Sequence, residues 1–234
     1  MRKTNRALYR STLQQQAINA ILQSFTREVA FLYLGEHLKL GDRGNSLLLD
    51  LIKTKELKEV KFADCLLKND DLTQIRNLLW EKTDKLIFRD NTDVGVEGCV
   101  LIKHLVTQRP VKVFSMWDCD VGPSQLSCLI QGLIAMKGDV IEEVNLRGSH
   151  MSTECCILLK QLLSAKRIKK LDLGHCRITN DQLIYLADGL EAMTGTMEVL
   201  NLRGNLIMRS EVDTFKVATK FKVIEVSYRS NHRI

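Results

Sequence analysis

The sequence predicts an α/β repeat protein in which short parallel strands alternate with helices. An apolar pattern, Leu-x-Leu-x-x-Cys/Asn-x-Ile, returns about every 28 residues and is clearest at 171–178 and 200–207. Apolar residues alternate with period two before each Cys/Asn position, which is typical of a half-buried strand. After that position they stand three to four residues apart, which is typical of a helix. Because no such unit buries its apolar face alone, we expect the units to stack into a common core.

Six units follow from aligning the Cys/Asn position, which we call the anchor. Apolar residues stand three and five positions before each anchor and usually two after it, with Asp93 as the exception. A last half-unit, Phe221-x-x-Ile224-x-Val226, supplies a terminal strand. Strands backed by wider helices should bend into a horseshoe with the sheet on its concave side. The anchors are Cys65, Asn91, Cys119, Ser149, Cys176 and Asn205.

Residues 1–54 lack this pattern. Apolar residues at helical spacing over 13–25 predict one helix, and Ser46 is placed to cap a second helix at 47–54. The simplest interpretation is an N-terminal helical cap over 1–54, which covers the first unit of a repeat domain at 55–234. The alternative is a separate docking or targeting segment.

The fuller pattern, Leu-x-x-Leu-x-Leu-x-x-Cys/Asn-x-Leu, resembles the leucine-rich repeat, and the unit length resembles its ribonuclease-inhibitor-like class. The resemblance covers residues 55–228, is most specific in the fifth and sixth units and is weakest in the second. It implies a right-handed horseshoe whose concave parallel sheet and adjoining turns bind other proteins. This scaffold serves many functions, so the resemblance names no partner.

Composition favours a soluble, cytoplasmic protein with reduced thiols. No stretch resembles a signal peptide, and no apolar run approaches the roughly 20 residues of a membrane helix. The seven cysteines fall at anchors or in predicted helices, without the spacing of zinc ligands. The five histidines have no acid or nucleophile partner in the pattern. We therefore expect no metal, no cofactor and no catalytic group.

Strand residues between the buried positions should point into the concave face and form the binding surface. Trp117 stands out, because tryptophan beside Arg147 and Arg203 is the mixture enriched at interaction hot spots. The alternative is that Trp117 packs locally against its neighbours. The predicted binding residues are Lys61, Arg89, Trp117, Asn145, Arg147, Asp172, Asn201, Arg203 and Tyr228.

Charges are segregated along each unit. Acidic residues follow the strands, and basic residues gather where helices end and strands begin; the densest basic group is Lys166, Arg167, Lys169 and Lys170. Helix dipoles alone explain this arrangement, at roughly 0.3–1 kcal/mol for each charge. The alternative is a basic rim that receives an acidic partner.

These features favour a non-enzymatic scaffold that binds another protein. They give no sign of a small-molecule substrate. Two thirds of the net charge of +6 belongs to residues 1–54, an arm that could contact phosphates or acidic lipids, but a solvated terminus is the simpler interpretation, and we do not expect a nucleic-acid partner. Two alternatives stay open. One is a regulatory module of a larger assembly or a GTPase-regulating scaffold, and the other is a bacterial effector that acts on host proteins after delivery into a host cell.

Overall fold

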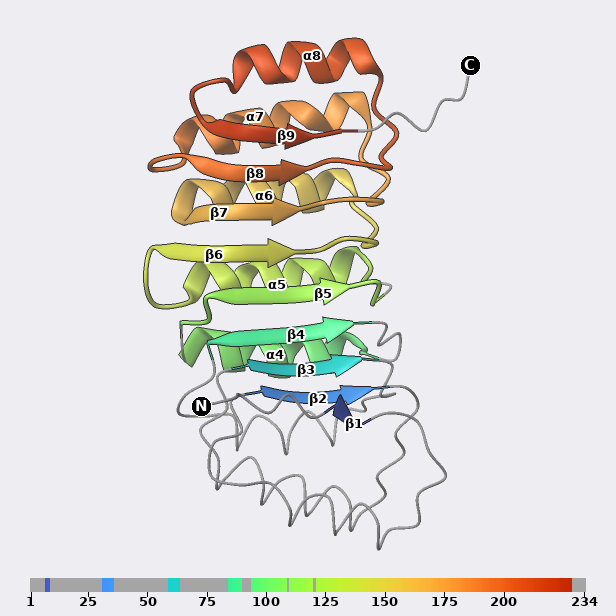
Figure 1. Ribbon diagram of the computed structural model, residues 1–234, viewed down its shortest axis with the longest axis vertical. Coiled ribbons are helices and arrows are strands. Elements are labelled where there is room, and N and C mark those ends of the chain that lie inside the picture. The colour runs from blue at the N-terminus through green and yellow to red at the C-terminus, as the bar shows by residue number, and fades with distance from the viewer. Residues whose placement is uncertain are drawn as a thin grey trace, which may run out of the picture.

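The computed structural model describes residues 7–8, 31–35, 59–63, 84–89, 94–108, 110–119 and 121–228. Its described strands form one sheet of nine, in chain order and with every neighbouring pair parallel (Figure 1). The strands are β1 (Ala7–Leu8), β2 (Phe31–Gly35), β3 (Glu59–Ala63), β4 (Lys85–Arg89), β5 (Val113–Trp117), β6 (Val140–Asn145), β7 (Arg167–Asp172), β8 (Met197–Asn201) and β9 (Val223–Ser227).

The described helices connect successive strands and lie together on one side of the sheet (Figure 1). The predicted alternation of parallel strands and helices is therefore confirmed. The helical elements are α4 (Val96–Gln108), α5 (Pro123–Ala135), α6 (Thr153–Ala165), the 3-10 turn η1 (Asn180–Gln182), α7 (Leu183–Ala192) and α8 (Arg209–Ala218).

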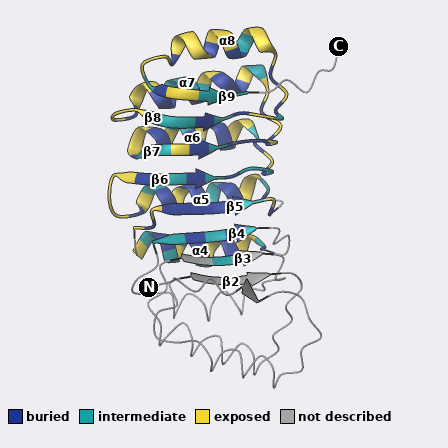
Figure 2. Cartoon of the chain, viewed as in Figure 1, coloured by how far each residue is buried: buried dark blue, intermediate teal, exposed yellow. Residues whose placement is uncertain are grey.

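Strand pairing joins residues at the same position of successive units. The residues five before the anchor pair in turn from β4 to β8, namely Leu86, Phe114, Val144, Leu171 and Leu200. All five are at most 1% exposed, and they belong to one hydrophobic core that runs from Leu86 to Val223 between the sheet and the helices (Figure 2). The predicted period-two alternation thus places the core as expected.

Helix starts are specified locally. Pro123 opens α5, and the Gln125 side chain accepts a hydrogen bond from the Gly122 N–H at 2.9 Å. Ser152 caps α6 by accepting from the Cys155 N–H at 3.3 Å. These contacts satisfy N–H groups that the first helical turn leaves without partners.

The sheet extends into residues 1–54, where the sequence predicts a helical cap. Strand β2 pairs with β3 in the common register, so that Leu32 stands beside Val60 and Leu34 beside Phe62. Strand β1 pairs with β2. The rest of this segment lies outside the described residues, so a cap around these strands stays a prediction.

The terminal half-unit has a different register from the predicted one. Val223 pairs with Met197, and Val226 pairs with Leu200, whereas Ile224 is 76% exposed. The repeating pattern therefore continues as Val223-x-x-Val226-x-Tyr228. The sequence predicts Phe221-x-x-Ile224-x-Val226 instead, and it cannot distinguish the two registers because both place apolar residues at the required spacing.

Candidate functional site

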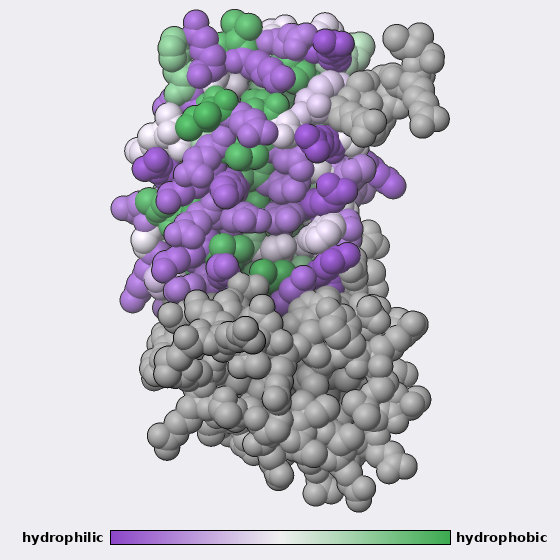
Figure 3. Space-filling view, viewed as in Figure 1, coloured by the Kyte–Doolittle hydropathy of each residue, from purple (hydrophilic) through white to green (hydrophobic). Residues whose placement is uncertain are grey.

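The sheet face directed away from the helices, here called the open face, is largely hydrophilic (Figure 3). One row of its residues lies four positions before the anchors and pairs across the sheet from β5 to β9. Asn145 and Asp172 of this row are half-buried rather than fully exposed. The row consists of Ser115, Asn145, Asp172, Asn201 and Ser227.

Three predicted binding residues of this row hold the turns that follow their strands. The Oδ1 atom of each accepts a hydrogen bond from the backbone N–H two residues later. The distances are 3.0 Å for Asn145, 2.8 Å for Asp172 and 3.1 Å for Asn201. Such side-chain contacts stabilise a tight turn at a strand end. Only their remaining side-chain atoms are available to a ligand.

Trp117 forms a cluster with two arginines at the end of β5. The guanidinium carbon of Arg89, on the neighbouring strand, lies 4.1 Å from the centroid of the indole ring. The guanidinium carbon of Arg147, from the next unit, lies 5.8 Å from the same centroid. Trp117 is half-buried, and its Nε1 has no hydrogen-bond partner. The ring thus packs against its neighbours, as the local alternative expected, but these neighbours are cations of the open face.

Arg203 lies two units beyond Arg147, and Gly174 occupies the equivalent position between them. A Cβ atom at Gly174 would lie 3.1 Å from Asp172 Oδ1 and 3.3 Å from Arg147 Nη1. Glycine therefore leaves the space that the carboxylate and the guanidinium use. The structure brings Arg89 and Arg147 to the ring, whereas Arg203 extends the same edge as an exposed side chain.

Tyr228 does not belong to the binding surface, contrary to the prediction. In the observed register it occupies a core-facing position, packs against the hydrophobic core and donates a hydrogen bond to the Ile207 carbonyl at 2.5 Å.

Lys61 stands in β3 and pairs with Ile87 on the next strand.

The predicted basic rim is wrong for Lys166, which is 8% exposed. Its Nζ donates to the carbonyls of Met136 and Gly138, at 2.7 Å each, and so closes the end of the preceding unit's helix α5. Lys222 repeats the contact with the Met193 carbonyl at 2.8 Å. These ammonium groups bind the terminal carbonyls of a neighbouring helix, which is a more specific role than a dipole interaction.

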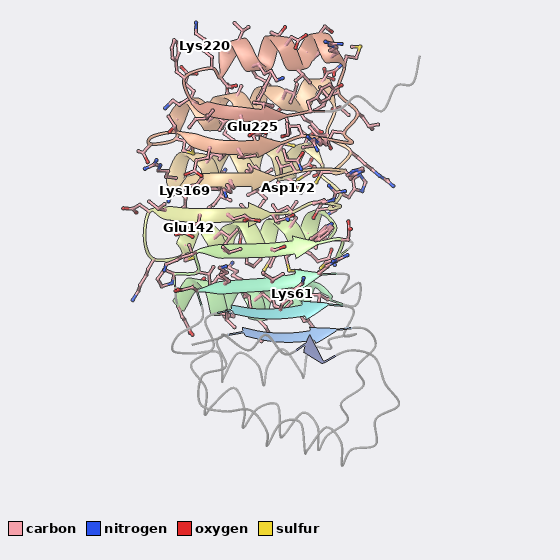
Figure 4. The ribbon with its side chains drawn as sticks, viewed as in Figure 1. Lys61, Glu142, Lys169, Asp172, Lys220 and Glu225 are labelled. Atoms are coloured by element: carbon pink, nitrogen blue, oxygen red, sulfur yellow. The ribbon has the colours of Figure 1, made fainter. Side chains whose placement is uncertain are left out.

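The other basic residues stand among acidic ones. Residues seven before the anchor alternate in charge over the described units: Asp84, Lys112, Glu142, Lys169 and Glu198. We call this row the strand-start rim. Lys112 forms an ion pair with Asp84 at 3.1 Å, and Glu142 and Lys169 lie on neighbouring strands (Figure 4). Lys170 pairs in register with Glu143, and Arg167 is half-buried. This edge is therefore mixed in charge rather than basic.

The anchors fill the turns. Asn205 donates to the carbonyls of Leu173 and Leu202 at 2.8 and 2.9 Å, and accepts from the N–H groups of Cys176 and Ile178 at 2.9 and 3.0 Å. Cys176 donates from Sγ to the Leu146 carbonyl at 3.2 Å. At these two positions the anchor side chains satisfy backbone groups of the turns.

Burial makes the core cysteines poor nucleophiles. It raises the pKa of the Cys99, Cys156 and Cys176 thiols to about 12, so these groups stay protonated at neutral pH. Cys65 lies outside the described residues. Within the described ranges, no group of three or more His, Cys, Asp or Glu residues is arranged to hold a metal ion, and no helix is long and apolar enough to cross a membrane.

Comparison with known proteins adds no family to these observations. No protein-family model matches the chain, and no curated protein matches it.

Proposed function

We propose that this chain is a leucine-rich-repeat solenoid of the ribonuclease-inhibitor-like class that binds another protein through its open face. The observation that carries the proposal is the cluster of Trp117 with Arg89 and Arg147 at the carboxyl ends of the strands. The binding surface comprises this cluster and Arg203. The activity is binding and not catalysis.

The register and the anchors support the solenoid. Phe88 pairs with Met116 and Leu171 with Leu200, so one unit separates each residue from its partner. Asn205 joins its own unit to the preceding one through three hydrogen bonds and makes a fourth within its own turn. Contacts of this kind between nearest neighbours are what stabilise a repeat array.

The chemistry of the cluster supports a protein ligand. Tryptophan and arginine are the residues most enriched at interaction hot spots, because they combine a large apolar area with directional polar groups. The Trp117 ring lies beneath the Arg89 guanidinium, which orders both side chains before any partner arrives. A preformed surface loses less conformational entropy on binding than a flexible one does.

Affinity purification with the wild-type chain and single variants tests this proposal. We expect Trp117→Ala and Arg147→Ala to lose the bound partner, as identified by mass spectrometry. Arg209→Ala is the matched control, because it removes an exposed arginine from the start of α8 in the helix layer. Circular dichroism melting curves confirm that each variant is folded.

The proposal fails if the folded Trp117→Ala and Arg147→Ala variants retain every partner of the wild-type chain. It also fails if Arg209→Ala loses the same partners, since the loss would then reflect charge alone and not this face.

A further inference from the structure

The hydrophobic core is not fully covered at β9, where the sheet ends. Within the described sheet β9 pairs only with β8 and is the last strand (Figure 1). Val226 pairs with Leu200 and continues the row whose five members on β4 to β8 are at most 1% exposed, yet Val226 is only half-buried. Tyr228, the next core-facing residue, is also half-buried. This end of the core therefore still has apolar surface to bury.

Exposed apolar side chains gather in the same unit. Among the large apolar residues of the described part of the chain, the three most exposed are Phe221 at 79%, Ile224 at 76% and Val217 at 70%. Ile224 stands on β9 itself. A single exposed apolar residue needs no explanation, but a group beside an open core is typical of an interaction surface.

The free edge of β9 lacks the features that keep strand edges from pairing. Native proteins protect such edges with proline, with lysine or with a covering element. The sequence of β9, Val-Ile-Glu-Val-Ser, contains neither proline nor lysine. Lys222, just before the strand, donates its ammonium to the Met193 carbonyl at 2.8 Å. No helix follows β9 in the described part of the chain, so another strand can add to the sheet here.

A second copy of β9 has the alternation that this edge requires. Its core-facing residues, Val226 and Tyr228, are apolar and pack against the core. Its open-face residues are polar, and the Ser227 hydroxyl donates to the Glu225 carboxylate at 3.1 Å. A two-fold axis perpendicular to the sheet would pair two such strands antiparallel and keep both open faces on the same side. Core-facing residues then meet core-facing residues across the junction.

The faces and the charge of β9 select one register for this pair. Opposite residues of an antiparallel pair share a face, so the axis must pass beside a residue and not between two. An axis at Glu225 would oppose two carboxylates, which is destabilising. An axis at Ile224 would set the open-face Glu225 against Val223, which is core-facing and 7% exposed. An axis at Val226 has neither fault.

We propose that the chain forms a two-fold dimer through β9, with the axis at Val226. Glu225 then lies opposite Ser227 of the second copy, whose hydroxyl can donate to the carboxylate, and Ile224 lies opposite Tyr228 of the second copy. A single strand pair buries less than the roughly 1,200 Å² of a standard interface, so we expect a dissociation constant of about 10–100 μM. The dimer involves the end of the array and is independent of the proposed binding face.

Sedimentation equilibrium between about 1 and 300 μM tests the dimer. The mass of the wild-type chain should rise from 26.7 kDa toward twice this value. Ile224→Lys should weaken association at least about tenfold, because it places a charge in an apolar contact, while the exposed position leaves the single chain folded. Ile184→Lys is the matched control, since it changes a 57% exposed isoleucine of α7 in the helix layer and should leave association unchanged.

Disulfide formation tests the register. In the proposed dimer the two residues 226 face each other, within the Cα separation of about 4.4–6.8 Å that a disulfide spans. The two residues 224 lie four residues apart along the strands, or about 14 Å. Val226→Cys should therefore form a disulfide-linked dimer under mild oxidation, whereas Ile224→Cys should not. The wild-type chain, with its seven cysteines, gives the background.

Charge at position 227 tests the same register without oxidation. Ser227→Lys places an ammonium opposite Glu225 of the second copy and should tighten the dimer about two- to fivefold. Ser227→Glu places a carboxylate there and should weaken the dimer by a similar factor. Both variants change the same half-buried residue of the open face, so circular dichroism serves as the common check that they are folded.

A wild-type chain that stays monomeric at every concentration would overturn the inference and leave this edge to a strand of another protein. A dimer that Ile224→Lys leaves intact would overturn it as well. Cross-linking of Ile224→Cys in place of Val226→Cys, or equal effects of the two Ser227 variants, would show that the register is wrong. Partner capture through Trp117 is measured separately, so either proposal can fail without the other.

Discussion

Replacing Asn205 by alanine tests the physical basis of the repeat. The amide is 2% exposed and makes four hydrogen bonds, two as donor and two as acceptor. Asn205→Ala leaves two buried carbonyls and two buried N–H groups without this partner. At about 1 kcal/mol for each bond, the free energy of unfolding should fall by about 4 kcal/mol.

Equilibrium unfolding in urea measures this loss, and amide hydrogen exchange locates it. The N–H groups of Cys176 and Ile178 both donate to the lost oxygen, so their exchange should accelerate more than that of β5 amides. Asn201→Ala is the matched control in the same unit. It removes a half-buried side chain with one bond, to the Arg203 N–H, and should cost about 1 kcal/mol or less.

Asn205→Cys should be intermediate, because a thiol donates to a carbonyl, as Cys176 does, but accepts poorly from two N–H groups. Two results would refute the reasoning. One is a cost for Asn205→Ala no larger than that for Asn201→Ala, and the other is unchanged exchange at Cys176 and Ile178.

Four further changes test other features. Lys166→Met should lower the free energy of unfolding by about 2 kcal/mol, because two buried carbonyls lose their donor, whereas Lys170→Met should change it by less than about 0.5 kcal/mol in urea titrations; equal costs would contradict the buried role. Gly204→Ala should lower the free energy of unfolding by about 2 kcal/mol in the same assay, because φ at Gly204 is +73° and the new Cβ would lie 2.5 Å from the imidazole of His175. An unchanged free energy of unfolding would contradict this backbone conformation. Burial raises the pKa of the Cys176 thiol from 9.0 to about 12, so its contribution to stability is fully present below pH 9 and is lost as the pH rises toward 12; Cys176→Ala should reduce this alkaline slope, and an identical slope would argue against burial of the thiol. Ile224→Lys continues the charge alternation of the strand-start rim, so it should raise the free energy of unfolding by about 0.5 kcal/mol at low salt and the melting temperature with it. An equal gain from Ile224→Glu would exclude an electrostatic cause.

The fold could be predicted from sequence wherever an anchor is present. The strands that contain Leu171 and Leu200 could be predicted because each of these residues is followed by a second leucine and by an anchor, Cys176 or Asn205, at fixed spacing. Strand β2 was missed although Leu32 and Leu34 stand in the right places, because the anchor position there holds a histidine. The prediction of each strand thus required a Cys, Asn or Ser anchor in the following turn, whereas formation of the sheet requires only the alternation of apolar residues.

The site could be predicted only in part. Strand register placed Trp117 and Arg147 on one face, and the structure brings them together. The contact of the Lys166 side chain with the end of α5 could not be predicted, because the sequence gives the charge of this residue but not the helix end that its long side chain reaches. Tyr228 was misplaced by the register error in the last unit, since a shift of two residues keeps the alternation intact and leaves no sign of the mistake.

The two edges of the sheet differ in how their charges are balanced, and this difference decides which edge can select a partner. On the strand-start rim each charge faces an opposite charge one unit away, as Lys112 does Asp84, so the field of the row cancels over a short distance. At the carboxyl ends of the strands, Arg89, Arg147 and Arg203 alternate with the uncharged Trp117 and Gly174, and the guanidinium carbon of Arg89 lies 4.1 Å from the centroid of the indole ring. The carboxyl ends of the strands therefore offer a partner the more specific contact surface, although basic residues are denser at the strand starts.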